Sequence, residues 1–171
     1  MQPFESLVLQ FKFGRREYLD RLLVDYLMAA LDQAPWRSEI EAFVPVPTHW
    51  FRKATGGFLP VPVITKYLAQ RVGIPDILLL QRTRLDPHQI GLSITQRINN
   101  VKGSFRVRPG AGIDGACICV VDDVMTSGAT LDEIAKTLKR AGAARVYNLI
   151  LARAGQPEAE LPLRENVSAK T

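Results

Sequence analysis

Short apolar runs alternate with segments of helical spacing along much of this chain. Residues 42–46, 77–80 and 146–151 are short apolar runs, and residues 116–121 read ACICVV. A run of this kind, rich in β-branched residues, is typical of a central parallel strand covered on both faces. Residues 61–72 and 131–141 carry apolar positions at helical intervals instead, and Gly142 is a stop signal for the second helix. The alternation predicts an α/β fold with a parallel sheet, right-handed crossovers and flanking helices.

The ends of the chain are predicted to differ from this core. Apolar residues between positions 7 and 27 have helical periodicity on either side of Gly14, which predicts an entry element and an amphipathic helix. We expect residues 1–35 to form a small hood over an α/β core at 40–154, the two together making one domain, 1–154. Residues 81–108 are too long for a plain connection, so we expect a binding loop or lid there. Residues 155–171 have little periodicity and are expected to be a loose tail.

Composition bounds the class of protein. The chain has 171 residues, of which 47% are hydrophobic, as expected of one domain with a substantial core. Charged residues, Glu5, Lys12 and Arg15 among them, interrupt the first apolar run. We therefore expect neither a secretory signal nor a membrane span, and we expect a cytoplasmic protein without a membrane partner. The net charge of +5 fits a polyanionic ligand, either a sugar phosphate or nucleic acid.

The segment VVDDVMTSGAT, at residues 120–130, is the strongest candidate site. Asp122 and Asp123 follow a buried strand, at the sheet edge where open α/β folds bind ligands. The small and hydroxyl residues after them lead into a helix, so backbone N–H groups and the helix dipole favour a phosphate. This order predicts a sugar-phosphate site, with carboxylates on ribose hydroxyls. The alternative is an Asp-rich strand end before an ordinary helix, with Thr130 and Glu133 as a capping box.

These residues resemble the phosphoribosyl pyrophosphate (PRPP) signature of type I phosphoribosyltransferases. The resemblance implies that Asp122 and Asp123 bind the 2′ and 3′ ribose hydroxyls. It also implies that the following loop binds the 5′-phosphate. The PRPP-binding set is Asp122, Asp123, Val124, Met125, Thr126, Ser127, Gly128, Ala129 and Thr130.

Other segments resemble the competence protein F (ComF) branch, whose members look like amidophosphoribosyltransferases without the glutaminase half. VPVPTHWFRKATGGF at 44–58 resembles its PVP segment, and FKFGRREYL at 11–19 its entry segment. The pattern at 81–107 matches through Arg82, Arg84, Gln89, Leu92, Ser93, Arg97, Asn100, Val101, Gly103 and Phe105. The resemblance covers residues 4–153.

Two further sets of site residues follow from the resemblance. Val46, Pro47 and Thr48 match the pyrophosphate loop, with Arg52 and Lys53 behind them; the alternative is a solvated basic loop. In the expected lid, which must keep water from PRPP, the residues are Arg82, Arg84, Gln89, Ser93 and Arg97. Arg97 joins Asp122 and Asp123 as a catalytic candidate, and solvated arginines are the alternative. Mg²⁺ is expected to arrive with PRPP rather than in a protein cage.

Two departures from the branch bear on activity. Many members begin with a four-cysteine zinc module, whereas this sequence has two cysteines, Cys117 and Cys119, which we expect to be packing residues. Many also read Arg-Gly-Phe-Asn-Gln where this chain has Gly56, Gly57, Phe58, Leu59 and Pro60. The missing arginine and amides are expected to affect the acceptor more than PRPP. His49 and His88 are read as surface residues, although His88 could reach a substrate.

The sequence leaves two functions open. The first is a Mg²⁺-dependent phosphoribosyltransferase that acts on an amine or nitrogenous base. The second is a PRPP-binding module with little catalysis, a regulatory or DNA-uptake role and single-stranded nucleic acid as a partner. The acceptor is not specified by the sequence, and a homodimer is left open.

Overall fold

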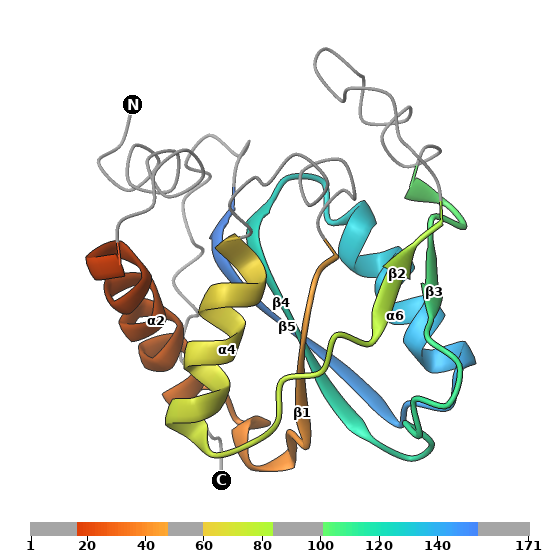
Figure 1. Cartoon of the computed structure of the whole chain (residues 1–171), viewed down its shortest axis with the longest axis horizontal. Helices are drawn as coiled ribbons and strands as arrows, with labels where there is room; N and C mark the ends of the chain where they lie inside the picture. The colour runs from red at the N-terminus through yellow and green to blue at the C-terminus, as the bar shows by residue number, and fades with distance from the viewer. Residues whose placement is uncertain (1–16, 48–59, 84–100, 154–171) are drawn as a thin grey trace, which may run out of the picture.

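A three-stranded parallel sheet forms the centre of the protein (Figure 1). The structure is a computed structural model that describes residues 17–47, 60–83 and 101–153. The sheet has the order β1-β4-β5, with β1 at Ala42–Pro45, β4 at Cys117–Met125 and β5 at Arg145–Arg153. Both pairings are parallel, so the carboxyl ends of the three strands meet at one edge of the sheet.

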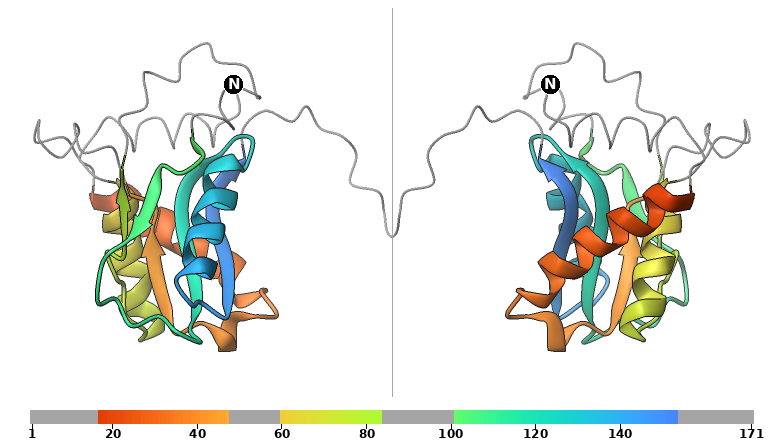
Figure 2. Two further views of the ribbon diagram at one scale, coloured as in Figure 1. Left: turned by 90° about the vertical axis from the view of Figure 1, so that its right-hand side faces the viewer. Right: turned by 90° about the vertical axis from the view of Figure 1, so that its left-hand side faces the viewer.

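Two layers cover the two faces of this sheet (Figure 2). Helices α2 (Glu17–Asp32) and α4 (Pro60–Val72) pack on one face. Helix α6 (Ala129–Arg140) packs on the other face, together with a separate antiparallel pair, β2 (Leu80–Arg82) and β3 (Phe105–Val107). A short 3₁₀ helix, η1 (Arg37–Glu39), leads from α2 into β1.

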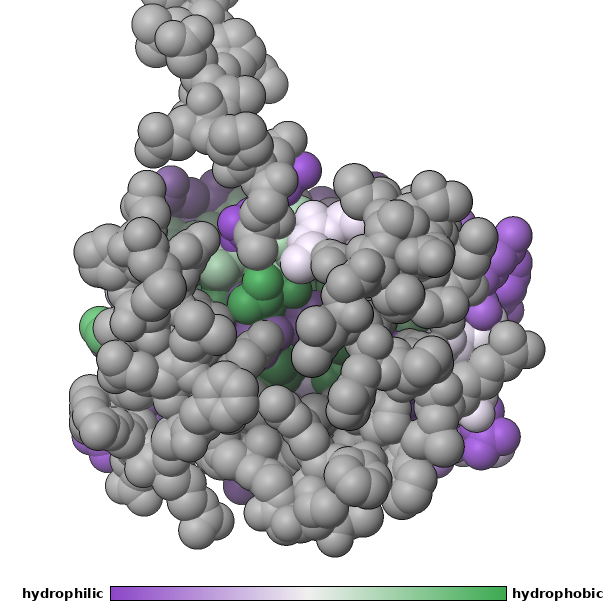
Figure 3. All heavy atoms as spheres, turned by 90° about the horizontal axis from the view of Figure 1, so that it is seen from above, coloured by the Kyte–Doolittle hydropathy of each residue, from purple (hydrophilic) through white to green (hydrophobic). Residues whose placement is uncertain are grey.

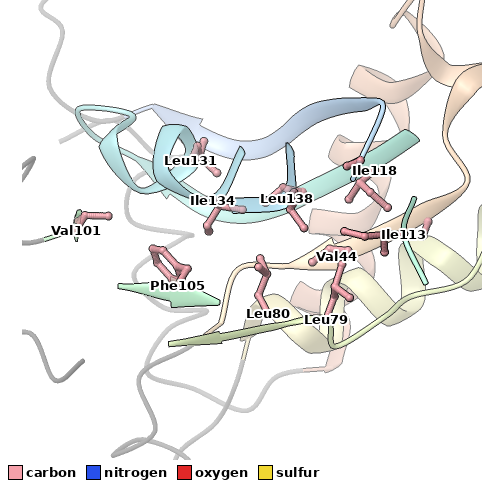
Figure 4. Packing of buried hydrophobic residues seen from close by; sticks show 13 residues of the cluster. Val44, Leu79, Leu80, Val101, Phe105, Ile113, Ile118, Leu131, Ile134 and Leu138 are labelled. Carbon is pink, nitrogen blue, oxygen red and sulfur yellow. The ribbon is translucent and has the colours of Figure 1, made fainter. Parts of the chain in front are cut away.

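Strand β4 is the centre of both halves of the core. Its side chains alternate between the layers, as the pleat requires. Ile118 and Val120 pack with α6 and the β2–β3 pair (Figure 4), whereas Cys119 and Val121 pack with α2 and α4. All four are at most 1% exposed, which is why this segment reads as a continuous apolar run.

The helices present stripes of buried residues to the sheet. These are Leu23, Val24, Leu27 and Leu31 in α2, Ile64, Leu68 and Ala69 in α4, and Leu131, Ile134 and Leu138 in α6. Their spacing of three and four residues is that of one helical face. The predicted parallel sheet with flanking helices is therefore confirmed.

The prediction of a central strand at residues 77–80 is wrong, because these residues are not a strand of the parallel sheet. Phe43 of β1 donates from its N–H to Pro75 O (2.9 Å) and accepts from Ile77 N (2.8 Å), so a short extended stretch borders β1 there. The chain then leaves the sheet, and Leu80 begins β2, which pairs antiparallel with β3. Part of the region predicted as a long loop at 81–108 is therefore the β2–β3 pair.

The hood and the tail remain predictions. Residues 17–32 of the expected hood form α2, which packs on the sheet beside α4. Residues 1–16 and 154–171 lie outside the described residues. Among the helices of the described ranges, none is both long enough and apolar enough to span a bilayer.

Cys119 is fully buried in the core and Cys117 is half-buried at the start of β4. Burial raises the pKa of the Cys119 thiol to about 12, because the thiolate loses its hydration there. This thiol stays protonated at neutral pH, in agreement with a packing role.

A polar network lies at the opposite end of the sheet from the strand carboxyl ends. Glu39 accepts a hydrogen bond from Tyr147 Oη (2.6 Å) and pairs with Arg145, the first residue of β5. Trp36 stacks on Tyr147 with 4.6 Å between ring centroids and 5° between planes. The hydrogen bond from Tyr147, followed by that from Arg145, lowers the pKa of the Glu39 carboxyl.

This network predicts a loss of stability in acid. Because the pKa of Glu39 is lowered in the folded state, its contribution is complete above the unfolded value of about 4.3 and is lost as pH falls through the folded value. Glu39→Gln should therefore flatten the fall of the urea midpoint between about pH 5 and pH 3. Tyr147→Phe keeps the ring that faces Trp36 and should flatten it partly. An unchanged slope in Glu39→Gln would reject the role of this carboxylate.

Candidate functional site

The acidic pair lies within the last part of β4. The sequence predicts that the strand stops at Asp122, but the ladder continues, with Asp122 opposite Ile150 and Met125 opposite Arg153. The strand extends because β5 runs beside it to Arg153 and supplies backbone partners. Asp122 and Asp123 are half-buried at this carboxyl end.

Each carboxylate is held by the next amide of the chain. Asp122 Oδ1 accepts from Asp123 N (2.9 Å), and Asp123 Oδ1 accepts from Val124 N (2.7 Å). These bonds fix the orientation of two adjacent oxygen groups at the sheet edge. Oxygen acceptors in a fixed orientation suit the hydroxyl donors of a sugar.

The loop after β4 leads directly into α6. Gly128 is the N-cap residue, in the left-handed conformation (φ 78°, ψ −8°), and no side chain caps the helix from this position. Ser127 Oγ lies 3.5 Å from Ala129 N, a long contact. Amide donors at the first turn of α6 therefore lack a side-chain cap from Gly128, and the helix dipole favours an anion there. Thr126 and Ser127 are exposed beside them, and Thr130 is half-buried.

The alternative of a capping box at Thr130 and Glu133 is wrong. The helix begins at Ala129, so Thr130 is already inside it. Glu133 Oε1 accepts instead from Gly103 N, 2.8 Å away and 30 residues earlier in the chain.

The end of β1 lies beside the acidic pair. Val46 N donates to Val121 O (2.9 Å), one residue before Asp122, and Val46 and Pro47 are half-buried there. The structure thus brings part of the predicted pyrophosphate set next to the predicted ribose set. Thr48, Arg52 and Lys53 lie outside the described residues.

Arg82 is the described member of the predicted lid set. It is half-buried in β2, opposite Phe105 of β3, and its guanidinium carbon lies 5.5 Å from the centre of the Phe105 ring. This distance is within the range of a cation–π contact. Arg84, Gln89, Ser93 and Arg97 lie outside the described residues, as do His49 and His88.

The contact between Glu133 and Gly103 was not predicted from the sequence. Glu133 is 8% exposed, although its residue type is typical of the solvent face of a helix. Its partner comes from a remote turn, so no local spacing rule could find the pair. The resemblance had singled out Gly103, but not the residue that binds its amide.

Among the described residues at this edge, Asp122 and Asp123 are the candidates for holding a metal ion. Over the described ranges, no cluster of three or more histidine, cysteine or carboxylate side chains is arranged to hold a metal ion. Asp122 and Asp123 supply hard oxygen donors, which fit Mg²⁺ when substrate phosphates and water complete its coordination. Figure 3 views this end of the molecule from above, and the described residues seen there include hydrophobic and hydrophilic ones.

Curated proteins with related sequences point to one family. Competence protein F of Haemophilus influenzae is 30% identical over 159 residues, which cover 90% of this chain and 69% of that protein. DNA utilization protein YhgH of Salmonella typhi is 33% identical over 159 residues, which cover 88% of this chain and 67% of that protein. No protein-family model matches the chain.

Solved structures agree at the level of the fold. An adenine phosphoribosyltransferase superposes with a TM-score of 0.54 and 18% identity, over 81% of this chain and 72% of that one. The glutamine PRPP amidotransferase of B. subtilis superposes with a TM-score of 0.53 and 21% identity, over 78% of this chain and 26% of that one. The chain has the type I phosphoribosyltransferase fold, and it belongs to the competence protein F family.

Proposed function

We propose that this protein binds PRPP with Mg²⁺ and transfers its phosphoribosyl group to an amine or nitrogenous base, with release of pyrophosphate. One observation carries the proposal: VVDDVMTSGAT lies where β4 ends and α6 begins, with oriented carboxylates and a helix start that Gly128 leaves without a side-chain cap. Family membership and the shared fold support it.

The proposed roles divide along the segment. Asp122 and Asp123 accept hydrogen bonds from the ribose 2′ and 3′ hydroxyls. The loop from Val124 to Thr130 binds the 5′-phosphate through backbone N–H groups and hydroxyls, and the α6 dipole favours the charge. Val46, Pro47 and Thr48 line the pyrophosphate side, where Arg52 and Lys53 supply positive charge.

In the proposed reaction the protein mainly orients the two reactants and neutralises the charge of the leaving pyrophosphate. A nitrogen lone pair attacks ribose C1, the C1–O bond to pyrophosphate breaks, and the nitrogen loses a proton. Orienting the two reactants contributes several kcal/mol to the lowered barrier. Arg97 is proposed as the cation that stabilises the leaving pyrophosphate. Bound Mg²⁺ would neutralise charge on the pyrophosphate oxygens.

The acceptor side is proposed only as a class. Gly56, Leu59 and Pro60 replace the arginine and amides common in the branch. These replacements affect binding of the acceptor more than binding of the donor, PRPP. The proposed lid comprises Arg84, Gln89 and Ser93, with Arg82 at its base in β2. A cytoplasmic location belongs to the same proposal, and a homodimer stays open.

The first test concerns the acidic pair. PRPP with Mg²⁺ should bind and raise the melting temperature, because it stabilises the folded state by mass action. Asp122→Asn and Asp123→Asn should each weaken binding by roughly 1 to 3 kcal/mol, the scale for hydrogen bonds to charged groups. Calorimetry measures both. Asp114→Asn is the control, because this exposed residue precedes β4 at its far end. Equal affinity in all variants would reject the ribose role, and no binding by folded wild type would reject the function.

The second test concerns Gly128. Gly128→Ala places a side chain at φ 78°, a conformation that costs about 1 to 2 kcal/mol. Gly73→Ala is a matched control, because Gly73 has φ 81° and room for a Cβ but follows α4. Both variants should lose similar stability in urea unfolding, and Gly128→Ala alone should bind PRPP more weakly. Equal PRPP affinity in the two variants would contradict a phosphate loop at this position.

A second candidate function is a PRPP-binding module with little catalysis that binds single-stranded DNA and has a DNA-uptake or regulatory role. The names of the relatives, competence protein F and DNA utilization protein, favour it, as does the net charge of +5. A screen of amines and bases for PRPP-dependent pyrophosphate release separates the two functions. Release without any acceptor preference, or none at all, would favour the module.

Binding to DNA, in this second function, should be electrostatic. A fluorescence titration with labelled single-stranded DNA at 50 and 200 mM salt should show affinity that falls steeply with salt and depends little on sequence. Reduced salt dependence in a variant with fewer basic residues would locate the contact. Absence of binding at the lower salt concentration would remove the DNA function.

A further inference from the structure

Glu133 is a buried carboxylate outside the PRPP-binding set. It lies in α6, four residues after Ala129 and three after Thr130, so it shares a helix face with the start of the phosphate loop helix. Its side chain accepts from Gly103 N at 2.8 Å, and the residue is 8% exposed. A buried carboxylate is costly without a partner, and this bond supplies one from the backbone of an exposed glycine.

The turn that contains Gly103 joins two further segments. Ser104 N donates to Val101 O (3.0 Å) and closes the turn, in which Gly103 has φ 71°. Thr83 binds the same turn twice, from its N–H to Ser104 O (2.8 Å) and from its hydroxyl to Gly103 O (3.0 Å). The end of β2 and the start of β3 are therefore fixed to one turn, and that turn is fixed to α6.

Apolar contacts hold the same parts together. Val101 and Phe105, on either side of the turn, are 2% and 6% exposed, and they belong to one cluster with Leu131 and Ile134 of α6 (Figure 4). Such packing is not directional, whereas a hydrogen bond fixes the turn in one register on the helix.

We infer that Glu133 is a positioning residue that fixes the turn at residues 101–104, and with it the β2–β3 pair, to the helix that carries the proposed 5′-phosphate loop. The inference rests on the proposed function. It predicts that PRPP, when it orders the phosphate loop, also stabilises the turn that contains Gly103, and that this effect requires the Glu133 carboxylate.

Amide hydrogen exchange at Gly103 and Ser104 tests this link, because Ser104 N lies in the same turn and donates to Val101 O rather than to Glu133. The wild type is measured by NMR with and without PRPP and Mg²⁺, with PRPP at 100 times its Kd. Ligand at this concentration slows any opening that destroys its site by up to about 100-fold. Exchange at Gly103 and Ser104 should slow by at least about 10-fold, together with the first-turn amides of α6.

Three variants separate positioning from plain stabilisation. Glu133→Met keeps the side-chain volume but removes the acceptor, so PRPP should still slow exchange in α6 and no longer at Ser104, whose own acceptor, Val101 O, is left in place. Glu133→Gln keeps an oxygen acceptor and should restore the response at Ser104. Asp132→Ala removes an exposed carboxylate from the same turn of α6 and should behave as wild type. A merely structural Glu133 would lower stability in Glu133→Met while leaving the ligand response of Ser104 equal to that of α6.

Calorimetry on the same samples separates the two proposals. PRPP should bind Glu133→Met within about threefold of wild type, because its direct contacts are untouched. Binding by wild type without slowed exchange at Gly103 and Ser104, or an equal response of Ser104 in Glu133→Met, overturns the positioning role and leaves the proposed function standing. Absence of PRPP binding by wild type overturns both.

Discussion

The burial of β4 between two layers is the constraint on which the rest of the structure depends. Strands on both edges and helices on both faces leave its middle residues at most 1% exposed. Fully burying one such aliphatic side chain contributes about 1.5 to 3 kcal/mol, so a shift of register along β4 is costly. The strand therefore presents Asp122 and Asp123 at the sheet edge because charge is tolerated only where the covering layers end.

The elements that the sequence predicts well are those whose signal is local. Residues 117–121 of the predicted run form the first part of β4, residues 61–72 lie within α4, and Gly142 follows α6. These predictions succeed because apolar spacing and a glycine stop act within a few residues. The segment from Asp122 to Thr130 owes its prediction to the same locality. Strand end, loop and helix start follow one another in the chain, so their order in the sequence is their order in space.

The elements that the sequence misplaces depend on remote partners. Residues 77–80 are apolar enough for a central strand, yet only a short stretch borders β1 before Leu80 turns to pair with Val107. The last residues of β4 are in the strand because they pair with β5. That strand begins at Arg145, 20 residues after β4 ends at Met125. The burial of Glu133 likewise depends on a remote partner, the backbone amide of Gly103. In each case the contact that determines the structure joins segments far apart in the sequence. The periodicity of apolar residues does not predict such contacts.

The Glu39 network and the acidic pair lie at opposite ends of the parallel strands. The paired residues Cys117 and Arg145 mark the start of β4 and β5, and Asp122 and Ile150 are paired five residues further on. At about 3.3 Å per residue, the Glu39 network and the acidic pair are roughly 16 Å apart along the sheet. Charges on the surface at that distance are screened beyond the Debye length of about 8 Å at physiological salt. Protonation of Glu39 therefore changes the stability of the fold without changing the local charge at the candidate ligand site.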